Sequence, residues 1–163
     1  GIAMAFNLFI KIGDIMGEST DDRHKDEIDV LGWAWGVSMA GSMSLGGGMG
    51  AGKPNFTDLT FTHNVDKATP NLFKTCATGK HVKEAKLAAR KAGEKQPEFL
   101  LITMSEVLIT HVAPAGSVAD GSMIESVSLQ FARVDMEYKP QLPDGSLDAG
   151  VHFTYDLRSN KPV

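Results

Sequence analysis

The chain has 163 residues, of which 42% are hydrophobic and 22% charged, and its formal net charge is −4. This length fits one domain with a single core, and the negative charge balance provides no basic field to attract a nucleic acid. A single cysteine excludes an internal disulfide and a cysteine-based zinc site, and no apolar run is long enough to span a membrane. No conventional signal peptide is predicted. We expect residues 4–163 to form one domain and residues 1–3 to be a cloning remnant.

The pattern of apolar residues predicts a mostly β chain. Six segments rich in β-branched, aromatic or alternating apolar residues are predicted strands: Phe6–Ile12, Glu27–Gly36, Phe56–Val65, Phe99–Val112, Ser126–Tyr138 and Val151–Leu157. Glycine with proline or aspartate predicts turns at 114–116, 143–145 and 148–150.

Two of these strands carry finer information. In Glu27–Gly36, Trp33 and Trp35 share one face, so Ala34 points the opposite way, although the register could differ by one residue. In Ser126–Tyr138, the apolar positions change parity near residues 132–133. A β-bulge there would produce such a change and would bend the strand, as a barrel wall requires.

One helix is predicted between Thr69 and Gly79. Thr69 followed by proline indicates an N-cap with proline at the first helical position, and Gly79 provides the end. Cys76 falls at helical spacing with the apolar residues of this helix, so we interpret it as a small buried side chain. The segment Glu84–Ala92 is ambiguous, because its composition favours a helix whereas its alternation also fits a strand.

A glycine-rich run, residues 47–54, begins like a phosphate-binding loop but does not complete the motif. Lys53 is followed by Pro54 instead of Ser or Thr, and a Thr-rich predicted strand follows in place of a helix. We therefore predict no nucleotide and no other cofactor.

The same run belongs to a long glycine-rich arm, residues 37–52, which we expect to contact another chain. Methionine is an adaptable contact residue, and long loops in small domains are commonly functional. The residues expected to make inter-subunit or inter-ring contacts are Met39, Met43, Leu45, Met49 and Lys53. A flexible linker without contacts is the alternative.

An acidic stretch, residues 14–27, surrounds His24 with carboxylates, but their order does not match a calcium loop. Two alternatives to an assembly protein therefore stay open. One is a small β-barrel metal-dependent enzyme that uses this stretch, and the other is a monomeric ligand-binding module. Neither a histidine pair with zinc-site spacing nor a nucleophile elbow is present, so we assign no catalytic or metal-binding residue.

Several motifs in order along the chain resemble the Hcp (haemolysin-coregulated protein) family, which forms the inner tube of the type VI secretion system. They are FIKIGDIMGEST, DEIDVLGWAWGVS, the glycine arm ending in AGKPN, DLTFTHNVDKATPNLFKTCATGKH and AKLAARKAG. The resemblance extends over nearly the whole chain from Met4.

The resemblance implies a two-sheet β-barrel with one side helix and a long loop, similar to phage tail-tube proteins, with residues 85–92 as a strand. It also implies homohexameric rings that stack into a tube, carry effector proteins in the lumen, and meet spike and sheath proteins. We place Ala34 in the lumen. The implied localisation is cytoplasmic before firing, followed by secretion through the system without a signal peptide or membrane insertion.

Overall fold

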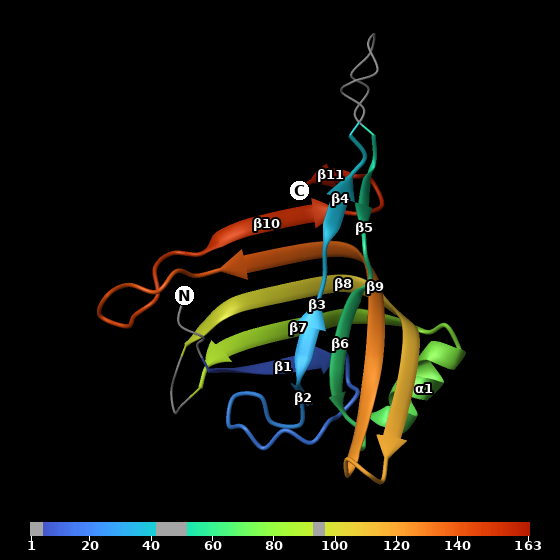
Figure 1. Ribbon diagram of the computed structural model, residues 1–163. Coiled ribbons are helices and arrows are strands. Elements are labelled where there is room, and N and C mark those ends of the chain that lie inside the picture. The colour runs from blue at the N-terminus through green and yellow to red at the C-terminus, as the bar shows by residue number, and fades with distance from the viewer. Residues whose placement is uncertain (1–4, 42–51, 93–96) are drawn as a thin grey trace.

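The computed structural model describes residues 5–41, 52–92 and 97–163, which form a barrel of antiparallel strands with a short helix beside it (Figure 1). The mostly β fold expected from the sequence is confirmed. Its elements are β1 (Phe6–Ile12), β2 (Ile28–Val30), β3 (Gly32–Ala34), β4 (Val37–Met39), β5 (Pro54–Phe56), β6 (Leu59–Asn64), α1 (Thr69–Ala77), β7 (His81–Lys91), β8 (Glu98–Ser117), β9 (Ser122–Tyr138), β10 (Val151–Asp156) and β11 (Lys161–Pro162).

The barrel closes through a bend in the chain at Leu31. β2 pairs with β1, followed in order by β7, β8, β9, β6 and β3. β2 and β3 are consecutive parts of one segment, and the amide of Leu31 between them donates to the carbonyl oxygen of Thr62 at 2.8 Å. The predicted strand Glu27–Gly36 is thus broken here. The break reverses the parity, so that Ile28 before it and Trp33 after it both pack against the core.

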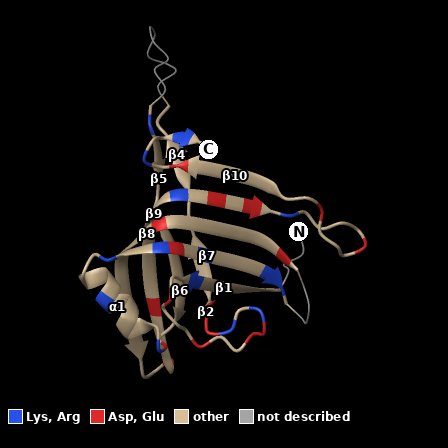
Figure 2. Ribbon diagram, turned by 180° about the vertical axis from the view of Figure 1, so that it is seen from behind, with Lys and Arg blue, Asp and Glu red and all other residues tan. Residues whose placement is uncertain are grey.

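Apolar side chains fill the barrel in rows that cross the strands. Ile10 of β1 lies opposite Leu87 of β7, which lies opposite Ile102 of β8, and all three are almost completely buried. The opposite face of these strands carries charges of both signs, which Figure 2 shows across β7 to β10. One pair in that face joins Arg133 of β9 to Asp156 of β10, with nitrogen and oxygen 3.4 Å apart.

Strand β9 pairs with three other strands of the barrel sheet. Its edge away from β8 pairs with β6 over residues 124–129 and with β10 over residues 133–138. Val127 and Leu129 are buried in the first part, whereas Ala132 and Val134 are buried in the second, so the predicted change of parity is confirmed. The bulge was predicted in the wrong place, because β9 keeps its register against β8 through 131–133.

The register shift between these strands lies in the partner strand β8, between Ile109 and His111. The predicted turn at 114–116 is also wrong, since these residues lie inside β8. Pro114 has no N–H group, so within a strand it is tolerated only at an edge without a hydrogen-bonded neighbour. Among the described residues, this half of β8 has such an edge, because only β9 pairs with it.

Helix α1 packs against β8 and buries Leu72 in the core. Its N-cap is Ala68, so Thr69 is the first helical residue and not the cap we expected, while proline follows as predicted. The Thr69 hydroxyl instead accepts a hydrogen bond from the amide of Asp66. Gly79 has a φ of +63° just beyond the helix, as its predicted role requires. No helix in the described ranges is long and apolar enough to cross a membrane.

The ambiguous segment is a strand, as the family resemblance implied. It forms most of β7, where Ala85, Leu87 and Ala89 face the barrel interior between β1 and β8. Pairing on both edges and burial of this face outweigh a helical propensity of a few tenths of a kcal/mol per residue.

The connection between β1 and β2 depends on a close backbone approach at Gly17. A Cβ atom added there would lie 2.5 Å from the carbonyl oxygen of Glu27 and 2.8 Å from the Cα atom of Ile28. We predict that Gly17→Ala lowers the free energy of unfolding by about 1–3 kcal/mol, because backbone must move to accept the methyl group. Denaturant unfolding measures this change. The control is Gly36→Ala, where a Cβ meets nothing within 4 Å, and equal stability of the two variants would contradict the prediction.

Candidate assembly surfaces

Ala34 lies in a row of small side chains on the outer face of β3, β6 and β9. Its side chain is exposed, and it pairs with Thr60 of β6. The hydroxyl oxygens of Thr60 and Ser128 lie 3.0 Å apart. The adjacent row continues this character with Gly32, Thr62 and Ser126. We call this face, formed by both rows, the small-residue face. It presents hydroxyl groups and little apolar surface, so contact with water over a wide area costs little free energy.

The sheet that carries the small-residue face has two open edges among the described residues. β3 pairs only with β6. At the other side, residues 109–117 of β8 pair only with β9, because pairing with β7 ends at Leu108. Open edges present unpaired backbone N–H and C=O groups, which are positioned to pair with another chain.

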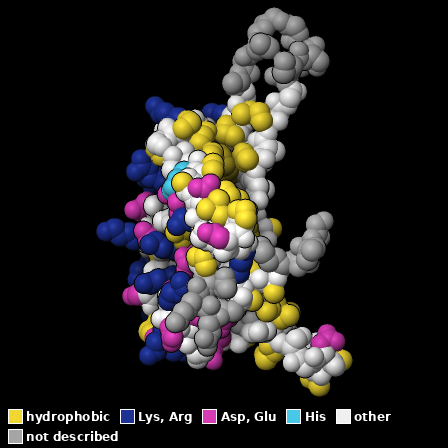
Figure 3. All heavy atoms as spheres, turned by 90° about the vertical axis from the view of Figure 1, so that its left-hand side faces the viewer, with side chains coloured by type: hydrophobic (Ala, Val, Ile, Leu, Met, Phe, Trp, Pro, Cys, Tyr) yellow, Lys and Arg dark blue, Asp and Glu magenta, His cyan; other side chains and the backbone are white. Residues whose placement is uncertain are grey.

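The base of the arm is a two-stranded ribbon formed by β4 and β5, which is a sheet separate from the barrel. Val37 and Met39 are 58% and 54% exposed on this ribbon. Figure 3 shows hydrophobic side chains gathered in this upper part of the molecule, where Figure 1 places the ribbon and β10. Lys53 is exposed just before β5. The other expected arm contacts, Met43, Leu45 and Met49, lie outside the described residues.

Aromatic rings attach the ribbon to the barrel. The ring of Phe56 in β5 lies 5.6 Å from that of Trp35, 5.2 Å from Tyr155 and 6.4 Å from Phe153. Below the ribbon, the amide of Gly36 donates to the Thr57 hydroxyl at 3.0 Å. Phe56 therefore joins the ribbon to β10 by ring contacts. Such contacts allow a wider range of angles between their partners than the backbone hydrogen bonds between paired strands do.

The glycine run does not complete a nucleotide site. Lys53 leads into strand β5 and not into a helix, so the helix N-terminus that would hold a phosphate group is missing from the described segment after it.

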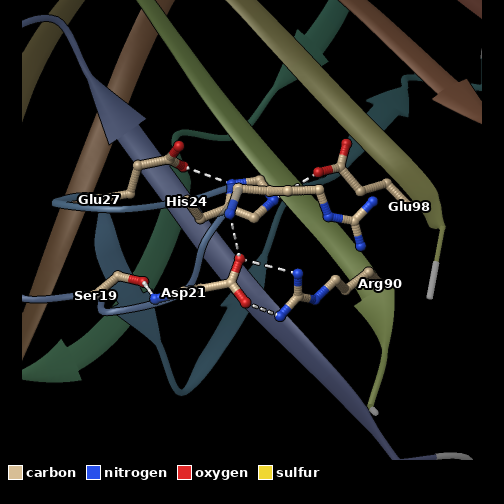
Figure 4. A network of polar contacts seen from close by, with 7 residues as sticks. Ser19, Asp21, His24, Glu27, Arg90 and Glu98 are labelled. Carbon is tan, nitrogen blue, oxygen red and sulfur yellow. Dashed lines mark hydrogen bonds and ion pairs between the residues drawn. The ribbon is translucent and has the colours of Figure 1, made fainter. Parts of the chain in front are cut away.

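Two carboxylates of the acidic stretch around His24 form hydrogen bonds with the side chains of His24 and Arg90 (Figure 4). Nδ1 of His24 lies 3.0 Å from Glu27 Oε1, and Nε2 lies 2.6 Å from Glu98 Oε1. Asp21 receives two hydrogen bonds from Arg90 of β7, and these bonds hold the pKa of Asp21 below its ordinary value. Within the described ranges, no group of three or more His, Cys, Asp or Glu side chains is placed to hold a metal ion. The geometry of this stretch therefore gives no support to a metal-dependent enzyme.

A buried polar pair that the sequence analysis did not identify lies where β6 and β9 meet α1. His63 Nε2 is 2.7 Å from Glu125 Oε1, and both side chains are fully buried. Thr69 donates to the same carboxylate oxygen at 3.2 Å, and burial raises the pKa of the adjacent Asp66. Alternation contained the signal, because His63 shares parity with Leu59 and Phe61, and Glu125 with Val127. The pair connects the start of the helix to the barrel wall.

The barrel interior leaves no obvious place for a small ligand. The buried side chains of β1, β6, β7, β8 and β9 form one continuous cluster with Leu72 of α1. The larger hollows among the described residues are on the surface, and one of about 730 Å³ is lined by Arg23, Glu98 and Lys139 among others. Among the described residues, this packed interior does not favour the ligand-binding alternative.

These features define a class of protein: a structural subunit with a packed core, an open-edged sheet and a projecting ribbon, which builds larger assemblies. Comparison with known proteins agrees with this class. The family model described as "Type VI secretion system effector, Hcp" matches residues 9–138. The chain is 52% identical over 159 residues to Protein hcp1 of Pseudomonas aeruginosa, covering 96% of this chain and 98% of that protein.

Solved structures show the same fold. The crystal structure of Hcp1 from Salmonella typhimurium is 40% identical, with a TM-score of 0.79, and the alignment covers 98% of this chain and all of that one. A structure described as that of a type six secretion system protein has a TM-score of 0.90 at 27% identity, with the same coverage. The chain belongs to the Hcp family. This is a family of secreted, structural tube subunits of the type VI secretion system and not of enzymes.

Proposed function

We propose that six copies of this chain form a ring, that rings stack into a tube, and that effector proteins travel in its lumen. The observation that carries the proposal is the small-residue face on a sheet with two open edges. If the edge at β3 of one copy meets the edge at β8 of the next, the sheets join into a continuous wall. This contact is head to tail, and it closes a ring when the angle between copies is fixed.

The lumen side of this wall is the small-residue face. A wide aqueous channel requires side chains that tolerate water, and Ala34, Thr60 and Thr62 meet that requirement. The mixed charges on the other side, across β7 to β10, are suited to contacts with the sheath. Spike proteins at the tube end are the other expected partner. The subunit assembles in the cytoplasm and leaves through the secretion system in this proposal.

The arm is proposed to join neighbouring subunits or rings. Its ribbon exposes Val37 and Met39 in the isolated subunit. Because each is only a little over half exposed, burying the remaining surface on a neighbour contributes about 1 kcal/mol per side chain, before the ordering cost of the arm is subtracted.

The first test is the mass of the particle in dilute solution. Size-exclusion chromatography with light scattering is expected to give about six times the mass of one chain, the value of a closed ring. A monomer at all accessible concentrations would overturn the proposed ring.

The second test addresses the lumen. We predict that Ala34→Arg changes the free energy of unfolding by less than about 0.5 kcal/mol, since the residue is exposed, and leaves the ring intact. The added side chain projects into the channel, so co-purification of a lumen-held effector falls. Ala77→Arg, at the exposed end of α1, is the control and retains effector. Equal effector recovery from both variants would show that Ala34 does not face the cargo.

The third test addresses the ribbon. Met39→Asp is expected to leave the monomer fold and ring mass unchanged, because Met39 is exposed and outside the barrel. Tube length by electron microscopy, or secretion by a host with the complete machinery, is expected to fall at least about tenfold, because a carboxylate is costly to bury at a contact. Ser38→Asp adds the same charge one residue away and is the control. Normal tubes from Met39→Asp would mean that the ribbon is only a linker.

A further inference from the structure

We propose that His24 is a proton-dependent clasp that, together with the Asp21–Arg90 ion pair, holds the loop between β1 and β2 on the barrel, and that its share of this hold is lost as the pH rises. The loop comprises residues 13–27. Backbone hydrogen bonds join its two ends: the amide of Gly17 donates to Asp26, and that of Ser19 donates to Glu27. The middle of the loop is held on the barrel largely by side chains.

The geometry at His24 requires a proton on each ring nitrogen. Both nitrogens lie within hydrogen-bond distance of a carboxylate oxygen, of Glu27 on one side and of Glu98 on the other. An ionised carboxylate accepts hydrogen bonds and donates none, so both ring nitrogens must donate. The imidazole is then positively charged, and it forms two charge-assisted hydrogen bonds in a site where only 7% of the residue is exposed.

Every element packed around the ring contributes to this arrangement. The ring of Phe9 in β1 stacks on His24, with centroids 4.3 Å apart and planes within 6° of parallel. The guanidinium of Arg90 in β7 lies 5.0 Å from the centre of the same Phe9 ring. Glu98 comes from β8, and Asp21, Glu27 and the neighbouring Arg23 come from the loop itself. Two of these carboxylates, those of Glu27 and Glu98, hydrogen-bond to the ring directly, one at each nitrogen.

The same arrangement occurs at a second histidine. Nδ1 and Nε2 of His152 lie 2.9 Å from Asp135 and 2.9 Å from Glu137, and the hydrogen bond to Asp135 raises the pKa of His152. That site is exposed on the outer face of β10, whereas His24 is buried between the loop and the barrel. Loss of the proton therefore has a structural consequence at His24: one ring nitrogen becomes an acceptor facing a carboxylate oxygen.

The direction of the pH effect follows from linkage. The two hydrogen bonds from the ring require a proton on each nitrogen, so they form when the ring is protonated and one of them is lost when the ring gives up a proton at higher pH. The loop leads directly into β2 and β3, so its release loosens the segment that closes the barrel and carries Ala34.

Two measurements on the intact protein test the clasp. Nitrogen-15 NMR of the histidine rings at about pH 6 is expected to show both nitrogens of His24 protonated. Hydrogen exchange of residues 13–27, corrected for the chemical rate, is expected to become at least roughly tenfold faster between about pH 6 and pH 8.5, the effect of losing a hydrogen bond to a charged group.

Variants separate the clasp from a general effect of pH. His24→Gln is expected to show fast exchange of residues 13–27 already at the lower pH, with no further change as the pH rises. His81→Gln, at an exposed histidine at the start of β7, is the control and is expected to behave like the unmodified protein. A neutral His24 ring at the lower pH, or wild-type pH dependence in His24→Gln, would overturn the proposal. If His24→Gln does not fold, the NMR measurement on the unmodified protein decides.

Discussion

The fold depends on one constraint, which is that strand β9 must pair with three different strands of the barrel sheet. β8 accompanies it along one edge, while the other edge passes from β6 to β10 within three residues. Where β9 changes partner, the side of the strand that is buried changes as well. Odd-numbered positions are buried up to Phe131, and even-numbered positions, Ala132 and Val134, are buried after it. The first half of β9 then presents the small-residue face, and the second half presents charges. One continuous strand therefore separates the surface proposed to line a channel from the surface proposed to meet other proteins.

The barrel combines a closed core with open strand edges, and this combination is suited to assembly. The chain closes the barrel at Leu31, so the apolar core is covered without a neighbouring subunit. The sheet with the small-residue face nevertheless retains open edges at β3 and at the second half of β8. The core is thus contained within one chain, while the edges among the described residues still offer backbone groups to a next copy. Membership of the Hcp family fits this division between a self-sufficient core and unsatisfied edges.

Much of the fold could be predicted from alternation and turn residues, and the failures have physical causes. β7 could not be assigned from composition, because its pairing on both edges is a tertiary effect that no local propensity contains. The imperfect alternation of β1 has its reason in Phe9, an outward-facing residue that the loop and Arg90 cover. The pairing of His63 with Glu125 joins positions 62 residues apart, so alternation placed each residue inward but could not identify its partner. Ala34 was placed on the correct face relative to Trp33 because a two-residue period survives on each side of the bend.

The attachment of the ribbon has a mechanical consequence. β4 and β5 hydrogen-bond to each other and are a separate sheet, and Phe56 meets the barrel through ring contacts. A tilt of the ribbon changes the angles between rings by small amounts and breaks no ladder of the barrel wall. Bending of the ribbon would therefore fall on this junction before it reached the hydrogen-bonded wall. A filament made of such subunits would absorb bending and sudden axial load at its joints and keep the bore of each segment constant.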